Sequence, residues 1–225
     1  MLSVVIPVLN AAADLQATLA AFTPSPTTDV AMPAEIIVVD GGSMDATRQV
    51  AAACGARVFA ASRGRGAQLV AGVAAATQPW LLLLHADTRL GQGWQAAAMA
   101  HMSGAPDRAG YFRFALASDD TRARQLERMV AWRCRVLALP YGDQGLLIHR
   151  DLLRAVGGVP LLPLMEDVEL VRRLGRHRLV ALDVAAVTSP AKWVREGWYR
   201  RSARNLACLA LYFGGVSPRL IARLY

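Results

Sequence analysis

The stretch EIIVVDGGSMDAT at residues 35–47 decides the fold. Residues 35–40 contain the apolar run IIVV and end in Asp40, a pattern typical of a parallel strand buried on both faces. After two glycines, residues 43–54 are expected to form a helix, with Ser43 as its N-cap and Gly55 just beyond its end. The stretch therefore predicts a strand followed by a helix, with an acidic residue at the carboxyl end of the strand.

The same alternation continues on both sides of this stretch. We expect strands at residues 2–7, 57–60 and 80–84, and helices at residues 11–22 and 66–76. Such a series predicts an α/β fold with an open, mixed but mostly parallel sheet and helices on both faces, whose ligands bind beyond the carboxyl ends of the strands. In the second half we expect strands at 110–116, 146–149 and 179–187, and helices at 121–139, 151–156, 166–175 and from about 196.

Composition narrows the class of partner and the compartment. The chain has 225 residues and a formal net charge of +8, which favours phosphates, nucleic acid or anionic membrane as partners. Of its 25 basic residues only Lys192 is a lysine. Three cysteines without CxxC spacing indicate neither a disulfide framework nor a zinc knuckle. The sequence shows no signal peptide or membrane-spanning run, so we expect a cytoplasmic protein.

Two motifs in the first half suggest binding of a phosphorylated ligand. The loop SRGRGAQL carries Arg63 and Arg65 at the start of a helix, where free backbone N–H groups and guanidinium groups can hold a diphosphate. The run LLLLHADTRL places His85 and Asp87 on one side of an extended chain, and Asp87 suits Mg²⁺ or Mn²⁺. Alternatively, Asp87 caps the next turn, and Asp45 of the first stretch favours a helix N-terminus.

Two further motifs in the second half offer carboxylates. PLPLMEDVEL places Glu166 and Asp167 at the start of a helix behind a proline-rich loop, where a general base could be held. Acidic residues also favour a first helical turn for dipole reasons alone, so both interpretations stay open. GDQG presents Asp143 and Gln144 to a hydroxylated acceptor. No zinc-binding histidine spacing and no nucleophile elbow are found.

Together these motifs resemble the family-2 glycosyltransferases of the GT-A fold, and most closely their small bacterial branch found beside radical-SAM genes. The resemblance rests on SVVIPVLN, VVDGGSMD, GRGAQL, LHADT, GDQG and PLMEDVEL, in that order along most of the chain. It implies one domain over residues 1–225, with a nucleotide-binding half at 1–90, an acceptor and catalytic half at 91–195, and an amphipathic helical segment at 196–225.

The resemblance also implies an activity: an inverting, metal-assisted transfer of a sugar from a nucleoside-diphosphate sugar to an acceptor hydroxyl. The donor-binding residues implied are Pro7, Asn10, Asp40, Gly42, Asp45, Arg65, Gly66 and Ala86. Asp87 and His85 are implied for a divalent metal ion, Asp167 and Glu166 for catalysis, and Asp143 and Gln144 for the acceptor. His85 replaces the first Asp of the family's DxD motif, and QxxRW is only echoed by Arg201 to Asn205, so processive polymer synthesis is not expected.

Two other classes of function remain as alternatives. A sugar-phosphate nucleotidyltransferase can share this fold, but it requires a glycine-rich segment after the first strand, where this chain has NAAADLQA. A noncatalytic binding protein for nucleotide or nucleic acid would use the positive charge. Carboxylates at the predicted strand ends would repel phosphates unless a cation intervenes, so we expect no nucleic-acid partner.

The C-terminal segment from Trp193 to Tyr225 combines arginines with aromatic residues and the apolar run LACLALYFGGV. One interpretation is a final helix docked on the domain's own core. The other is an interfacial helix on the inner face of the cytoplasmic membrane, which would present the active site to a lipid-linked acceptor instead of a soluble carbohydrate. We slightly favour the docked helix.

Overall fold

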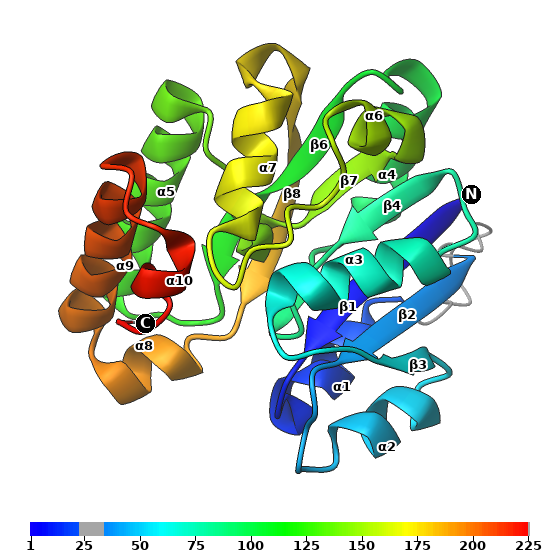
Figure 1. The fold of residues 1–225 in the computed structure, drawn as a ribbon, viewed down its shortest axis with the longest axis horizontal. Coiled ribbons are helices and arrows are strands. Elements are labelled where there is room, and N and C mark those ends of the chain that lie inside the picture. The colour runs from blue at the N-terminus through cyan, green and yellow to red at the C-terminus, as the bar shows by residue number, and fades with distance from the viewer. Residues whose placement is uncertain (23–33, 225) are drawn as a thin grey trace.

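A mixed sheet of eight strands organises the part of the chain that the computed structural model describes, residues 1–22 and 34–224 (Figure 1). The strand order is β3-β2-β1-β4-β7-β6-β8-β5. Parallel pairing joins the first four strands and also β6 to β8, whereas β4 with β7, β7 with β6, and β8 with β5 are antiparallel. The strands are Leu2–Val8 (β1), Glu35–Asp40 (β2), Arg57–Ala60 (β3), Trp80–Leu83 (β4), Thr88–Leu90 (β5), Ala109–Leu116 (β6), Leu146–His149 (β7) and Leu179–Thr188 (β8).

Helices cover both faces of this sheet, as the sequence predicts. They are Ala12–Ala20 (α1), Thr47–Ala53 (α2), Arg65–Ala75 (α3), Trp94–Gly104 (α4), Thr121–Leu137 (α5), Arg150–Ala155 (α6), Glu166–Leu174 (α7), Ala191–Glu196 (α8), Trp198–Phe213 (α9) and Pro218–Ile221 (α10). Alternate residues of β1 separate the two layers: Ile6 packs with α1 and α4, and Val5 packs with α3 and α7. The α/β prediction with a mostly parallel sheet is therefore confirmed.

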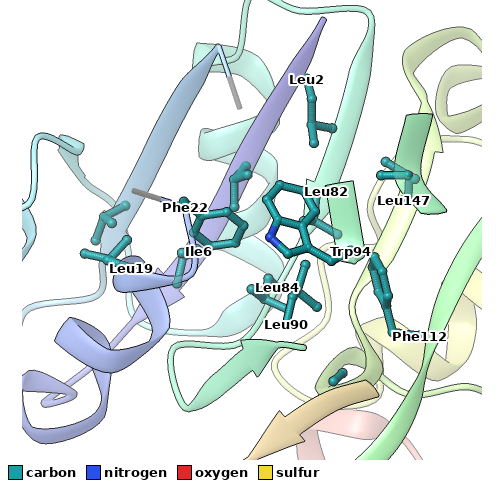
Figure 2. Packing of buried hydrophobic residues seen from close by; sticks show 14 of the residues in the cluster. Leu2, Ile6, Leu19, Phe22, Leu82, Leu84, Leu90, Trp94, Phe112 and Leu147 are labelled. Carbon is teal, nitrogen blue, oxygen red and sulfur yellow. The ribbon is translucent and has the colours of Figure 1, made fainter. Parts of the chain in front are cut away.

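The larger core cluster lies on the α1 and α4 side of the sheet (Figure 2). Trp94 meets Phe22 edge to face with ring centroids 5.2 Å apart, and both rings lie against apolar strand residues such as Ile6 and Leu82. Both faces of β1 and β4 are buried, which explains why these strands are unbroken apolar runs in the sequence. This packing fixes the strand ends that carry the site.

Three local expectations differ from the structure. Helix α2 begins at Thr47, because Ser43 lies in the preceding loop, where its hydroxyl accepts a hydrogen bond from the Asn10 amide. Strand β5 and helix α4 occupy residues for which the sequence predicts no element. The C-terminal segment forms three helices, and the first of them starts at Ala191. No helix in the described part of the chain is long and apolar enough to cross a membrane.

Candidate active site

The reversal of strand direction between β4 and β7 brings distant acidic residues together. Leu83, the last residue of β4, pairs with Leu146, the first residue of β7. The segment after β4, which carries Asp87, therefore lies beside the segment before β7, which carries Asp143. Both residues line a cavity of about 120 Å³. Of the predicted site residues, Arg65, His85, Asp87, Asp143 and Asp167 line this cavity, and the others do not.

Asp87 is held by an ion pair with Lys192. The Lys192 ammonium lies 2.7 Å from Asp87 Oδ2, and the Asp87 carbonyl accepts a hydrogen bond of 2.9 Å from the Ser189 amide. This second contact ties the loop after β4 to the end of β8, directly before α8. Burial alone would raise the pKa of Asp87, but the Lys192 charge keeps that pKa below its ordinary value. Asp87 therefore presents an ionised carboxylate to the cavity.

His85 lies against Arg65, with Nε2 3.0 Å from a guanidinium nitrogen. Because a guanidinium can only donate, Nε2 must be the unprotonated nitrogen of the ring. Burial and the Arg65 charge lower the pKa of His85 to about 4, so the imidazole is neutral near pH 7. Gly142 makes this position possible, since a Cβ there would come within 2.5 Å of His85 Nε2.

Asp167 and Glu166 differ in their environments although they are neighbours. Asp167 accepts hydrogen bonds from the backbone amides of Gly142 at 2.9 Å and Val168 at 2.8 Å. Burial alone would raise the pKa of Asp167, but Arg65 and the Gly142 amide lower it below its ordinary value, so the carboxylate stays ionised. Glu166 is 1% exposed and pairs with Arg65 Nε at 2.7 Å. Burial raises the pKa of Glu166 to about 7 despite this pair.

Backbone geometry explains why only one of these two carboxylates faces the cavity. Met165 has a φ of 64°, a left-handed conformation that is uncommon for a residue with a side chain. This turn precedes α7, and within a helix successive side chains point about 100° apart. Asp167 lines the main cavity and also a smaller neighbouring one, whereas Glu166 lines only the smaller one. In this position Glu166 orients Arg65.

The GDQG segment divides its two polar residues between two environments. Asp143 faces the cavity, and its Oδ1 atom is buried without a hydrogen-bond donor among the described residues. Burial raises the pKa of Asp143 to about 6. Gln144 is 2% exposed, donates to the Phe112 carbonyl at 3.0 Å and accepts from the Tyr141 amide at 3.2 Å. The structure therefore brings Asp143, but not Gln144, to the predicted acceptor position.

The predicted nucleotide loop forms its own connected network at the carboxyl ends of β1 and β2. Asp40 is fully buried, accepts from the Ser43 amide at 3.0 Å and pairs with Arg48 at 2.5 Å. Gly42 has a φ of 96°, which glycine adopts without strain. Asp45 accepts from the Thr47 amide at 3.0 Å, and therefore also supports the start of α2.

The other predicted nucleotide residues have structural contacts. Pro7 is buried in β1, and the Asn10 side chain accepts from the Met44 amide at 2.9 Å. The Ala86 carbonyl accepts from the Thr18 hydroxyl at 2.7 Å. At Gly66 a Cβ would meet the Leu162 carbonyl oxygen at 2.5 Å, so α3 approaches the loop before α7 closely.

Several residues to which the sequence assigns no role complete the cavity. Lys192 comes from α8, and Arg201 and Asn205 come from α9. Arg201 is 7% exposed and pairs with Glu196 at 2.9 Å. The only available signal for Lys192 is that it is the single lysine in the chain. For Arg201 and Asn205 the only sequence signal is the weak echo of QxxRW between them.

A divalent cation fits the residues present. Among the described residues, no group of three or more His, Cys, Asp or Glu side chains is arranged to hold a metal ion by itself. Asp87 supplies an ionised oxygen and His85 a neutral imidazole in the same cavity. Mg²⁺ is commonly held by one or two carboxylates together with the phosphates of a substrate, so this small set is sufficient when a diphosphate binds.

The sequence and the fold are similar to those of known proteins. The model of glycosyl transferase family 2 matches residues 3–153. Glucosyl-3-phosphoglycerate synthase from Mycobacterium tuberculosis, in complex with Mn²⁺, UDP-glucose and phosphoglyceric acid, is 20% identical, with a TM-score of 0.61 over 96% of this chain and 80% of that one. A crystal structure of a mycobacterial protein is 22% identical, with a TM-score of 0.58 over 84% of this chain and 65% of that one.

A second complex of the same synthase, with Mn²⁺ and UDP-glucose, is 20% identical, with a TM-score of 0.60 over 84% of this chain and 71% of that one. These structural likenesses confirm the predicted GT-A fold. No curated protein matches the sequence. Membership of the small bacterial branch stays a prediction.

Proposed function

The chain belongs to glycosyl transferase family 2 and is a glycosyltransferase, and on this basis we propose that it transfers a sugar from a nucleoside-diphosphate donor to an acceptor hydroxyl with inversion. A nucleotidyltransferase and a noncatalytic binding protein are thereby set aside. Complexes of the similar synthase contain UDP-glucose with Mn²⁺ or UDP with Mg²⁺, which supports a nucleoside diphosphate and a divalent ion as the ligands here as well.

One observation carries the proposal. A single cavity collects Asp87 from the loop after β4, Asp143 from the turn before β7 and Asp167 from α7, together with Arg65 from α3. Glycosyl transfer needs positive charge at the departing diphosphate and a base near the attacking hydroxyl. The cavity supplies both kinds of group within one small volume.

In the proposed donor complex the diphosphate lies between the loop after β4 and the start of α3. Asp87 and His85 would hold the divalent ion, which neutralises charge on the leaving diphosphate. Arg65 and Lys192 direct their cationic groups into the same cavity. The Asn10 and Asp40 loop lies at the neighbouring strand ends and is the proposed position of the nucleoside.

Asp167 is the proposed general base. As the acceptor oxygen forms its bond to the anomeric carbon, the bond from that carbon to the diphosphate oxygen breaks, and the acceptor proton moves to Asp167. The low pKa of Asp167, held down by Arg65 and the Gly142 amide against the effect of burial, keeps the carboxylate free of protons before the reaction. Attack opposite the leaving group inverts the anomeric carbon.

Substitution of Asp167 tests this assignment. Asp167→Asn should lower turnover about 100-fold or more, which is the usual contribution of a general base, and should leave nucleotide affinity nearly unchanged. Turnover is measured with UDP-glucose and a hydroxylated acceptor, and nucleotide affinity by calorimetry. A nucleotide affinity that falls as far as turnover would contradict the role.

Donor binding is tested separately by thermal shift. A ligand that binds only the folded state must raise the midpoint of unfolding. We expect a nucleoside diphosphate to stabilise the protein, and Mn²⁺ to increase the stabilisation. Lack of any response across the nucleoside diphosphates, with and without Mn²⁺, would refute the proposed donor class.

We also propose a peripheral contact between α9 and the inner face of the cytoplasmic membrane, which would favour a lipid-linked acceptor. Helix α9 docks through buried Trp198 and Cys208, but Tyr199, Leu206 and Phe213 on it are exposed. Exposed apolar residues beside arginines suit an anionic lipid surface. Cosedimentation with anionic vesicles should exceed that with neutral vesicles and weaken with salt. Equal recovery with both vesicles would exclude the contact.

A further inference from the structure

The cavity has an apolar half that contains none of the residues proposed to hold the donor. This half is lined mainly by apolar residues of the loop before α7, of α7 itself, of α8 and of α9: Leu164, Met165, Val168, Trp193, Cys208 and Leu209. The wall is well packed, because Leu164 and Met165 are each 8% exposed and Cys208 is 2% exposed. Such a surface favours an apolar part of a ligand.

Buried polar atoms also line the cavity. Trp193 Nε1 has no hydrogen-bond acceptor among the described residues. Asn205 Oδ1 and Asp143 Oδ1 are both buried, and neither has a hydrogen-bond donor among the described residues. A buried acceptor without a partner is costly, on the order of 1–3 kcal/mol, so a bound molecule that donates hydrogen bonds would be stabilised here. Both atoms accept hydrogen bonds, and the matching groups on a ligand are hydroxyls.

The charges of the wall disfavour an anionic acceptor. Its described cationic side chains are Arg65, Lys192 and Arg201, and each is already paired with a carboxylate, on Glu166, Asp87 and Glu196 respectively. The diphosphate of the donor would bind to Arg65 and Lys192. Beside the apolar half the wall presents the carboxylates of Asp143 and Asp167, which repel an anion.

We propose that this half of the cavity is an acceptor subsite for a neutral, hydroxylated molecule with an apolar portion, and that Asn205 accepts a hydrogen bond from one of its hydroxyls. The inference rests on the proposed glycosyl transfer and adds the chemical class of its acceptor. The apolar portion lies against Leu164, Met165 and Leu209, and a second hydroxyl of the acceptor donates to Asp143.

Direct binding tests the subsite without reference to turnover. Hexyl β-glucoside is a neutral probe with hydroxyls and an apolar chain, and phosphoglycerate is an anionic probe. Each is titrated by calorimetry and by saturation-transfer NMR into the protein with UDP and Mn²⁺, and again into the protein alone. We expect saturable binding of hexyl β-glucoside and at least tenfold weaker binding of phosphoglycerate.

Two variants and one control identify the position of the bound probe. Asn205→Leu removes the accepting oxygen at similar size and should weaken hexyl β-glucoside about tenfold, while UDP affinity is unchanged. Leu209→Trp fills the apolar wall and should abolish binding of the probe. Leu220→Ala alters an exposed residue of α10 outside the cavity and should have no effect. Retained UDP affinity and a cooperative unfolding transition show that each variant is folded.

The outcomes separate this subsite from the donor assignment. Failure of UDP to bind the wild-type protein counts against the proposed function, and the titration of the protein alone still decides the subsite. Absence of hexyl β-glucoside binding, tighter binding of phosphoglycerate, or full affinity in both Asn205→Leu and Leu209→Trp would overturn the neutral acceptor subsite.

Discussion

Substitution of Lys192 by methionine should make Asp87 a better metal ligand in the absence of donor. In the free protein the Lys192 ammonium takes the carboxylate oxygen that a divalent ion needs, at 2.7 Å. The Lys192 side chain is 49% exposed and that of Asp87 is 11% exposed, so solvent weakens the pair. A contribution of about 1–2 kcal/mol is appropriate for a charged hydrogen bond that is half screened. Its loss should increase Mn²⁺ affinity about 5- to 30-fold.

The assay is a titration of Mn²⁺ followed by electron paramagnetic resonance, without nucleotide. Lys192→Met is compared with the wild type and with Lys192→Arg, which retains the positive charge and should change the affinity less. In the presence of UDP the wild type should bind Mn²⁺ more tightly than Lys192→Met. The variant lacks the ammonium that would contact the diphosphate. An equal Mn²⁺ dissociation constant in wild type and Lys192→Met, without nucleotide, would refute the view that Lys192 competes for Asp87.

Three further predictions concern the fold and the pH dependence. Gly66→Ala should lower the free energy of unfolding in urea by about 1–3 kcal/mol, because the new Cβ would overlap the Leu162 carbonyl. A gain of about 1 kcal/mol, the value expected at an unhindered helix position, would contradict this. Hydrogen bonds from Ser3 and Thr77 outweigh burial and lower the pKa of Glu35 from 4.5 to about 2, so its stabilisation is present above pH 4.5 and lost as the pH falls toward 2. Glu35→Gln should therefore cost up to about 3 kcal/mol at pH 7 and almost nothing at pH 2, and an equal cost at both pH values would exclude this linkage. Burial raises the pKa of Asp143 to about 6, so acceptor kcat/KM should fall below pH 6 as the carboxylate is protonated, and a fall that persists in Asp143→Asn would assign it to another group.

The parts of the fold that depend on local sequence were predictable. Strands β1 and β4 are apolar runs buried on both faces, and their termini agree with the predicted ranges to within one residue. Helix α4 was missed because its alanine-rich sequence follows Gly93, which has a φ of 82° and offers no side-chain cap. Strand β5 has three residues, too few for a recognisable alternation.

The same distinction applies to the site. Asp87 follows β4 by four residues, so its position near the carboxyl end of that strand followed from the sequence. Its contact with Lys192, 105 residues away, depends on β8 lying next to both β5 and β6, which no local pattern encodes. The resemblance implies Asp167 as the base, but no local pattern shows that Glu166 lies outside the main cavity and pairs with Arg65, which is 101 residues earlier in the chain.

The solitary ammonium of Lys192 gives the protein a built-in spectroscopic label. Reductive methylation with ¹³C-formaldehyde modifies primary amines, and this chain offers only Lys192 and, where it is free, the N-terminal amine of Met1. Loss of one methyl signal in Lys192→Met assigns that signal to Lys192. One carbon resonance would then report the environment of Asp87 through metal addition, donor addition and turnover.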